Sequence, residues 1–385
     1  MLKRCSCIFI PLIILAAGLS ERMGVFKPLL PVGDSPAIIR CVKTAEAAGI
    51  RDIAIVTGNM RDELEAAVRM GAPGARLVHN AGYHDGMFSS VRAGVAALPD
   101  GIDGFFLLPA DCCAVSSDTL LKLMDEFTKA RSSAVMRTRF EGRRGHPPLI
   151  PARYVGPLLA YGGDRGLKGF LSGLPTVELE MDNPGSLLDM DTPGDYAELL
   201  THLGLPAYPA PGSCAELMEK YGASQEIVEH GKQVAALALK IARLMSLSIE
   251  RREPVSGEID VALLESSCML HDIGRTSPRH ARVGMEILLR EGYPMAAELV
   301  GGHMDLPYPA QGGHAPVVSE MELLYLADKL CRRGNVVMPE DTLRALESRF
   351  SDNHAAMESA RGRMSAARAI LDTLQSQYSI SFADL

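Results

Sequence analysis

Apolar residues in the first half of the chain form short runs that alternate with segments of helical spacing. Short apolar runs bounded by turn residues predict strands at 8–15, 52–57, 76–79 and 104–108. Apolar residues at helical spacing predict helices at 36–48, 62–70 and 89–97. This alternation is typical of a Rossmann-like α/β domain, with a mostly parallel sheet and helices on both faces. Ligands in such domains bind at the carboxyl ends of the strands.

The second half of the chain has almost no strand pattern. Apolar residues at helical spacing predict helices at 227–244, 259–270, 281–289, 295–300, 320–330 and 355–375. Between the halves, Gly204, Pro206, Pro209 and Pro211 interrupt both patterns, as linkers do. We therefore predict an α/β domain at 1–203, a linker at 204–215 and an all-α domain at 216–385.

Composition narrows the class of protein. Of 385 residues, 47% are hydrophobic and 22% are charged, which supplies apolar material for two globular cores. The net charge of −8, without a long Lys/Arg run, argues against a nucleic-acid partner. Eight cysteines in so long a chain do not resemble a secreted disulfide scaffold, so we expect reduced thiols and a cytoplasmic protein.

The N-terminal residues allow two interpretations. Lys3 and Arg4, followed by the apolar segment 8–17, imitate a signal peptide. A buried first strand at 9–15 explains the same residues, and we favour it because cleavage after Ala17 would cut into the loop described next. The apolar segment is too short to span a bilayer, so we expect no membrane partner.

A glycine-rich loop follows the first predicted strand, where residues 15–30 read LAAGLSERMGVFKPLL. Such a turn exposes successive backbone N–H groups that bind phosphate oxygens, and Gly18 and Gly24 permit close approach. Arg22 and Lys27 place cations on the same loop, where they can neutralise a triphosphate. The loop is neither a Walker A motif nor a dinucleotide fingerprint.

This loop, continued through Pro31 and Gly33, resembles the signature of MobA-like nucleotidyltransferases. That family includes molybdenum cofactor guanylyl- and cytidylyltransferases, and the Ala-Ala-Gly sequence at 16–18 resembles the cytidylyl branch. Further similarity to the family's motifs lies at 86–94, 108–111, 145–147, 163–168 and 189–193. The resemblance covers about residues 8–200 and implies transfer of a nucleoside monophosphate from an NTP, with CTP favoured, to a phosphorylated acceptor.

The resemblance also implies roles for individual residues. Arg22, Lys27 and Asp111 would be catalytic, with Mg²⁺ held by Asp111 and Asp191. The expected nucleotide-binding residues are Leu15, Ala16, Ala17, Gly18, Ser20, Arg22, Gly24, Lys27, Ser89, Ser90 and Asp111. The expected acceptor-binding residues are His146, Asp164, Arg165 and Lys168.

Each of these assignments has a structural alternative. Asp111 at a strand end could cap a helix, and Asp191, before Thr192 and Pro193, could merely open one. His146 could be a structural loop residue. Cys113 stands where the family usually has proline, a departure that bears on the local turn.

A second set of candidate residues lies on the predicted helices: His230, the adjacent His271 and Asp272, His280, His303 and Asp328. Imidazoles and carboxylates gathered in this way can bind divalent cations. The segment 222–332 is similar to the HD superfamily of metal-dependent phosphohydrolases. The resemblance implies one or two divalent metals (Mn²⁺, Fe²⁺, Mg²⁺ or Ni²⁺) on all six residues, with His271 and Asp272 catalytic. The other histidines, at 79, 84, 202, 314 and 354, are expected on the surface or in packing.

Two departures bear on the HD substrate. Met304 stands where the HD-GYP subgroup carries a second histidine, and the GYP segment is missing, which argues against cyclic di-GMP. Our leading hypothesis is cytidylyl transfer from CTP to molybdopterin with release of pyrophosphate, joined to an HD phosphohydrolase. A molybdoenzyme or its maturation factor would be a partner. The alternatives are transfer to a sugar or polyol phosphate, or an HD domain that senses nucleotide and regulates the other domain.

Overall fold

The computed structural model describes residues 8–249, 258–308, 318–332, 334–349 and 353–385. The chain divides into two compact units, Met1–Leu205 and Pro206–Leu385. Lys3 and Arg4, the basic part of the signal-like pattern, lie outside the described residues, as does His314.

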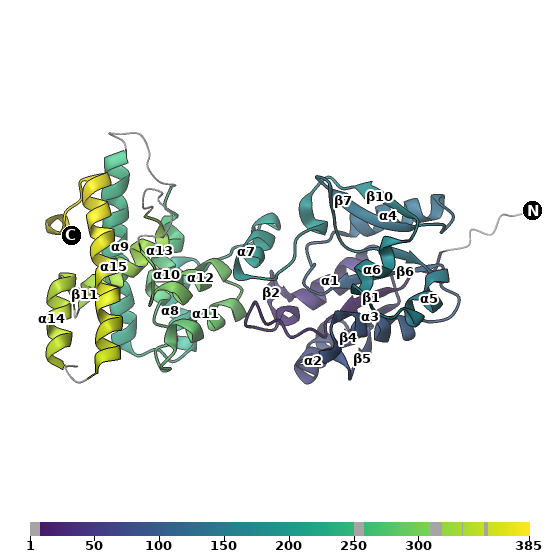
Figure 1. Ribbon diagram of the computed structural model, residues 1–385, viewed down its shortest axis with the longest axis horizontal. Coiled ribbons are helices and arrows are strands. Elements are labelled where there is room, and N and C mark those ends of the chain that lie inside the picture. Colours follow the sequence, from purple (N-terminus) through teal and green to yellow (C-terminus); the bar gives the residue numbers. More distant parts are fainter. Residues whose placement is uncertain (1–7, 250–257, 309–317, 333, 350–352) are drawn as a thin grey trace, which may run out of the picture. The chain divides into compact units, whose positions relative to one another are not determined.

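The first unit is built around one sheet (Figure 1). Its described part has eight strands in the order β10-β7-β9-β6-β1-β4-β5, with β8 paired to β7 alone. The strands are β1 (Leu12–Leu15), β4 (Ile53–Thr57), β5 (Arg76–His79), β6 (Gly104–Pro109), β7 (Val135–Phe140), β8 (Arg143–Arg144), β9 (Leu149–Pro151) and β10 (Thr176–Glu180). β1 pairs in parallel with both β4 and β6, so Leu15, Val56 and Pro109 lie side by side.

Helices cover both faces of this sheet. Ile13 on β1 packs in a core with Val91 and Val95 of α3, while its neighbours Leu12 and Ile14, which point to the opposite face, are also fully buried. The helices are α1 (Ala37–Ala47), α2 (Arg61–Gly71), α3 (Met87–Ala96), α4 (Ser117–Lys129), α5 (Val155–Ala160), α6 (Gly166–Ser172) and α7 (Pro193–His202). The predicted α/β fold with a mostly parallel sheet is confirmed.

Two details of the sheet differ from the sequence pattern. The first strand begins at Leu12 rather than Ile8, because Pro11 has no N–H to donate and contributes only its carbonyl, which accepts from Phe106 N at 3.0 Å. β9 lies between β6 and β7 and is antiparallel to both. β9 follows the loop that contains His146, and it runs antiparallel to β6.

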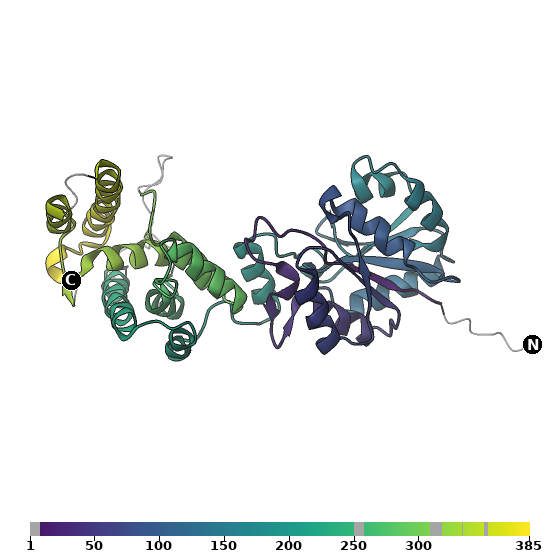
Figure 2. The same ribbon diagram turned by 90° about the horizontal axis from the view of Figure 1, so that it is seen from below.

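The second unit is helical, apart from the short hairpin of β11 (Cys331–Arg332) and β12 (Asn335–Val336) (Figure 1 and Figure 2). Its helices are α8 (Cys214–Lys220), α9 (Gln225–Ile249), α10 (Val261–Leu270), α11 (His280–Arg290), α12 (Pro294–Gly302), α13 (Glu320–Leu330), α14 (Pro339–Arg349) and α15 (His354–Tyr378). α10 packs against α9, α12 and α13. The predicted all-α half is confirmed.

The residues expected to form a linker, 204–215, span the division between the units. They contain the short helix η5 (Pro211–Ser213) and the start of α8. Ala207 is buried, and its carbonyl accepts from Met295 N at 3.0 Å.

Candidate functional site

A cavity of about 510 Å³ opens at the carboxyl end of β1. Its lining includes most of the residues expected to bind nucleotide: Leu15, Ala16, Ala17, Gly18, Ser20, Arg22, Lys27, Ser90 and Asp111. Gly24 and Ser89, which were also expected, do not line it. The Ser89 hydroxyl instead donates to the carbonyls of Gly82 and Gly86, so it holds the turn before α3.

The loop after β1 is shaped by local hydrogen bonds. Gly24 has a φ of 77°, a conformation that favours glycine, and its N–H donates to Ser20 O at 3.1 Å. Ser20 Oγ accepts from Lys27 N at 3.2 Å. These bonds turn the chain back so that Arg22 and Lys27 lie at the same cavity.

Lys27 joins the two aspartates that were expected to bind magnesium. Its ammonium lies 2.6 Å from Asp111 Oδ2 and 2.8 Å from Asp191 Oδ1. The side chain of Lys27 is only 13% exposed, whereas Arg22, 2.6 Å from the other oxygen of Asp191, is 70% exposed. Residues that are far apart in sequence therefore form one cluster at the cavity, in which positive and negative side chains alternate.

Burial and neighbouring charge act against each other in this cluster. Burial works to lower the pKa of Lys27, but Asp111 and Asp191 raise it above its ordinary value. Burial works to raise the pKa of Asp191, but Lys27 and Arg22 lower it. For the adjacent Asp189, burial and the charges of Asp191 and Asp111 all raise the pKa. The cluster thus keeps Lys27 charged and Asp191 ionised.

The two aspartates do not serve mainly as helix caps. Ser116, not Asp111, caps α4 by accepting from Thr119 N. Thr192 caps α7, in a capping box with Asp195, so Asp191 precedes the cap and both its oxygens face cations. Two carboxylates at one cavity supply the hard oxygen ligands that suit Mg²⁺. Cys113, at the family's proline position, is buried.

The four residues expected to bind the acceptor are not brought together. His146 lines the cavity, and its Nδ1 is buried without a hydrogen-bond partner among the described residues. Asp164, Arg165 and Lys168 are exposed at the start of α6 and do not line the cavity. The structure of this cavity therefore does not support a role for these three residues in binding the acceptor.

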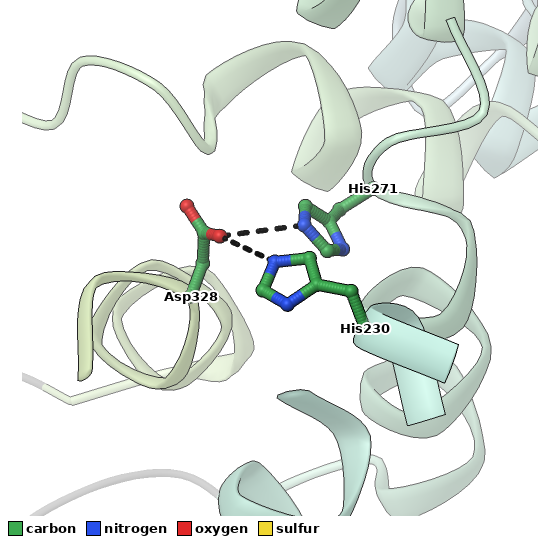
Figure 3. Close-up of side chains that lie close together, drawn as sticks. All are labelled: His230, His271 and Asp328. Carbon is green, nitrogen blue, oxygen red and sulfur yellow. Dashed lines mark hydrogen bonds and ion pairs between the residues drawn. The ribbon is translucent and has the colours of Figure 1, made fainter. Parts of the chain in front are cut away.

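The helical unit gathers the second set of candidates. His230 comes from α9, His271 ends α10, and Asp328 comes from α13; Figure 3 shows both imidazoles facing the carboxylate. Asp328 Oδ1 lies 3.3 Å from His230 Nε2 and 3.4 Å from His271 Nε2. The close approach of α9 to α10 depends on Gly231, because a Cβ there would lie 2.6 Å from the carbonyl of Met269.

A second group of ligand atoms adjoins the first. His271, Asp272 and His303 offer atoms within 4.8 Å of one another, as do His230, His271 and Asp328. His280 Nε2 lies 3.4 Å from Asp272 Oδ1. The structure therefore brings together all six residues expected from the sequence. His271 belongs to both groups.

The imidazoles are oriented as metal ligands usually are. His271 Nδ1 lies 2.8 Å from Cys268 O, and His303 Nδ1 lies 2.6 Å from Val300 O, so each ring directs Nε2 toward the cluster. His303 Nε2 is buried and has no hydrogen-bond partner in the part of the chain that the structure describes. A buried nitrogen lone pair of this kind fits a divalent cation.

Burial and neighbouring charges shift the pKa values of residues in the helical cluster. Burial works to raise the pKa of Asp328, but Lys329, His230 and His271 hold it well below its usual range. Burial, with the charge of His271, lowers the pKa of His303 to about 4, which keeps the ring neutral. A neutral imidazole beside an ionised carboxylate is the ligand state that divalent metals require.

Several residues near the two sites were missed from the sequence. Tyr83 and His84, with ring centroids 3.9 Å apart, line the first cavity, although His84 was expected only on the surface or in packing. Lys329 and Arg275 contact Asp328 and Asp272 at 2.6 and 3.1 Å. Lys329 adjoins a candidate ligand in sequence, and this was the only available signal for it.

Comparisons with known families match both units. Residues 12–179 match the MobA-like NTP transferase domain, and residues 227–333 match the HD domain. Over 184 residues the chain is 28% identical to the molybdenum cofactor cytidylyltransferase of Escherichia coli K12, covering 48% of this chain and 92% of that protein. A stretch of 87 residues is 38% identical to a tRNA (cytidine(56)-2'-O)-methyltransferase of Thermoplasma volcanium, covering 22% of each chain.

Among solved structures, Rv0371c of Mycobacterium tuberculosis H37Rv is 30% identical, with a TM-score of 0.45, over 50% of this chain and 98% of its own. Within the described residues, none of the helices is long and apolar enough to cross a membrane. The six described cysteines, expected to be reduced, are free and buried.

Proposed function

This chain carries a MobA-like NTP transferase domain followed by an HD domain, and on that premise we propose that it transfers CMP from CTP to molybdopterin. In this reaction an oxygen of the acceptor phosphate attacks the α-phosphorus of CTP, the bond between the α-phosphorus and the bridging oxygen breaks, and pyrophosphate leaves. We propose further that the HD domain hydrolyses a phosphate ester. The residues that carry the first proposal belong to the first unit, and those that carry the second belong to the second unit.

One observation carries the first proposal. The ammonium of Lys27 lies 2.6 Å from Asp111 and 2.8 Å from Asp191, at a cavity that the glycine-rich loop lines. The similarity to a molybdenum cofactor cytidylyltransferase over 92% of that protein supports the choice of nucleotide and acceptor. The Ala16-Ala17-Gly18 sequence supports CTP over GTP.

The chain's own residues would act by positioning and by charge. Backbone N–H groups of the loop at 16–20 would hold phosphate oxygens, and Lys27 and Arg22 would stabilise the charge on the departing pyrophosphate. Asp111 and Asp191 would hold Mg²⁺, which when bound aligns the phosphates and screens their charge. Because Lys27 contacts both aspartates, we propose that the NTP phosphates take over part of its ion pairing.

At the HD site, one divalent cation would be held by His230, His271 and Asp328. A second cation would be held by Asp272, His280 and His303, and His271 could contribute to it as well. Metals in such a pair activate water and neutralise the departing phosphate oxygen. Arg275, which lies 3.1 Å from Asp272 Oδ1 and is half exposed, would offer its guanidinium to a substrate phosphate.

A nucleotide and acceptor screen tests the transferase proposal. The full chain is incubated with Mg²⁺, molybdopterin and each of CTP, GTP, ATP and UTP, and pyrophosphate is measured. We expect release with CTP that depends on molybdopterin. Glucose 1-phosphate replaces molybdopterin in a parallel arm, and release there alone would favour a sugar phosphate acceptor. Absence of pyrophosphate with every nucleotide would contradict the proposal.

A further inference from the structure

Two cationic side chains contact the carboxylates of the helical cluster, and they do so in different ways. Lys329 lies 2.6 Å from Oδ2 of Asp328, whereas the nearby imidazoles face Oδ1 of that carboxylate. Arg275 lies 3.1 Å from Oδ1 of Asp272, and His280 Nε2 lies 3.4 Å from the same oxygen. Lys329 and the candidate ligands thus contact different oxygens of one carboxylate, but Arg275 and His280 share a single oxygen of the other.

The turn after α10 places Arg275 beside these atoms. The backbone N–H of Arg275 donates to Asp272 O at 2.9 Å, so both side chains leave the same turn. Gly274 lets this turn approach α11 closely, because a Cβ there would lie 2.7 Å from the backbone nitrogen of Gly284. His280 begins α11 and therefore lies next to the turn.

Arg275 contacts His280 as well as Asp272. Its Nη1 lies 3.5 Å from His280 Nε2. A guanidinium has N–H donors and no acceptor, so Nε2 faces it with its lone pair. Burial lowers the pKa of His280, with Asp272 working to raise it and Arg275 to lower it, so the ring is neutral near pH 7. One nitrogen of a neutral imidazole has a single lone pair, which either an N–H donor or a metal ion can take.

The two groups of candidate ligands therefore differ. In the group of His230, His271 and Asp328, both imidazoles face an oxygen that Lys329 does not hydrogen-bond (Figure 3). In the other group, the guanidinium of Arg275 takes up the ligand atoms of Asp272 and His280. Its positive charge also works against the approach of a cation to these atoms.

We propose that Arg275 occupies the place of a second cation, so that the helical cluster binds one divalent metal tightly and a second only when Arg275 moves away. This inference rests on the metal binding proposed for the HD domain. The cation at His230, His271 and Asp328 binds first. Displacement by the second cation frees the half-exposed guanidinium for a substrate phosphate.

The test uses Mn²⁺ as the probe. The full chain is stripped of metal with a chelator, titrated with Mn²⁺ and followed by electron paramagnetic resonance. Two Mn²⁺ ions about 3.5–4 Å apart are magnetically coupled, so their signal differs from that of an isolated ion in either unit. We expect the wild type to show isolated Mn²⁺ first and the coupled signal only at higher concentration.

Arg275→Met should lower the Mn²⁺ concentration needed for the coupled signal by about tenfold or more, because it frees both ligand atoms and removes a charge. The control Arg279→Met removes the same charge from an exposed position beside His280 and should change that concentration by less than about twofold. If Arg275→Met does not fold, Arg275→Gln, which also removes the charge, takes its place.

The double variant Arg275→Met/His280→Ala tests whether the lone pair of His280 is the one that Arg275 takes. The gain of Arg275→Met should be lost in it, because a ligand of the second cation is gone. A coupled signal that forms as easily in the double variant as in Arg275→Met would overturn the inference.

The outcomes separate this inference from the proposed hydrolysis, which is assayed with p-nitrophenyl phosphate. Hydrolysis together with an unchanged coupled signal in Arg275→Met would overturn the inference and leave the function standing. An earlier coupled signal in Arg275→Met, without hydrolysis, would support the inference and count against the function. A coupled signal that appears together with the isolated signal in the wild type would also overturn the inference, because the second cation would then meet no competitor.

Discussion

The ammonium of Lys329 lies 2.6 Å from Oδ2 of Asp328, the carboxylate whose other oxygen faces His230 and His271. Lys329 is only 9% exposed, and it also donates to the carbonyl of His303 at 3.3 Å. It therefore holds one oxygen of Asp328 away from the imidazoles and leaves Oδ1 toward them. In this way a residue that is not itself a candidate ligand orients one that is.

Replacing Lys329 with methionine should destabilise the metal-free protein. Removing one partner of a buried ion pair leaves the other charge uncompensated, at a cost of about 3 kcal/mol. Mn²⁺ should restore much of this loss, because the cation would neutralise Asp328 in place of Lys329. Chemical denaturation with and without Mn²⁺ measures both effects. The matched change Lys232→Met removes an exposed ammonium of α9 and should alter stability by less than about 0.5 kcal/mol. If Lys329→Met and the wild type were equally stable without metal, the ion pair of Lys329 with Asp328 would not contribute to stability.

Replacing Asp272 with asparagine should separate the two activities. The change removes one anionic oxygen from the group of His271, Asp272 and His303, so bound metal and phosphate-ester hydrolysis should both fall. Pyrophosphate release should stay within about twofold, because independent sites do not couple. Metal analysis and both assays measure this. Glu298→Gln, which removes an exposed carboxylate of α12, is the control. Retained metal would contradict the role of Asp272 as a ligand. If Asp272→Asn mainly alters the transferase response to nucleotide, the HD domain is a sensor.

Glu65 on α2 should make stability depend on pH. The hydrogen bond from Arg61 Nε, at 2.8 Å, with the charges of Arg61 and Arg69, holds the pKa of Glu65 below 4.5 against the effect of burial. A carboxyl whose pKa is lower in the folded than in the unfolded protein contributes its full stabilisation when the pH is above the unfolded pKa. This stabilisation is lost as the pH falls from the unfolded pKa through the folded pKa. Glu65→Gln should therefore be less stable than the wild type at pH 7, and the difference should shrink below pH 4.5. Denaturation at several pH values checks this, and a difference that grows on acidification would contradict it.

The sequence predicts the role of a residue when that residue stands in a recognisable local motif. It does not predict a role that depends on contacts with residues far away in the chain. The glycine-rich loop and the six candidate metal ligands stand in recognisable local sequence, and the structure brings Lys27 to Asp111 and His230 to Asp328. The antiparallel insertion of β9 was missed because the few residues of Leu149–Pro151 give no direction. α14 was missed because its residues are mostly polar. Lys329 gained significance only when the structure showed that its ammonium contacts Asp328.

Label transfer from CTP tests the central claim most directly. CTP labelled at the α-phosphate, or separately at the γ-phosphate, is incubated with the full chain, Mg²⁺ and molybdopterin, and the products are separated. Lys27→Met serves as the site variant, and Lys43→Met, an exposed lysine of α1, serves as the control. We predict that the α-label enters the acceptor product, that the γ-label appears in pyrophosphate, and that Lys27→Met slows both by about 10²-fold or more. Release of the γ-label as orthophosphate, with no α-label in the acceptor, would contradict the account.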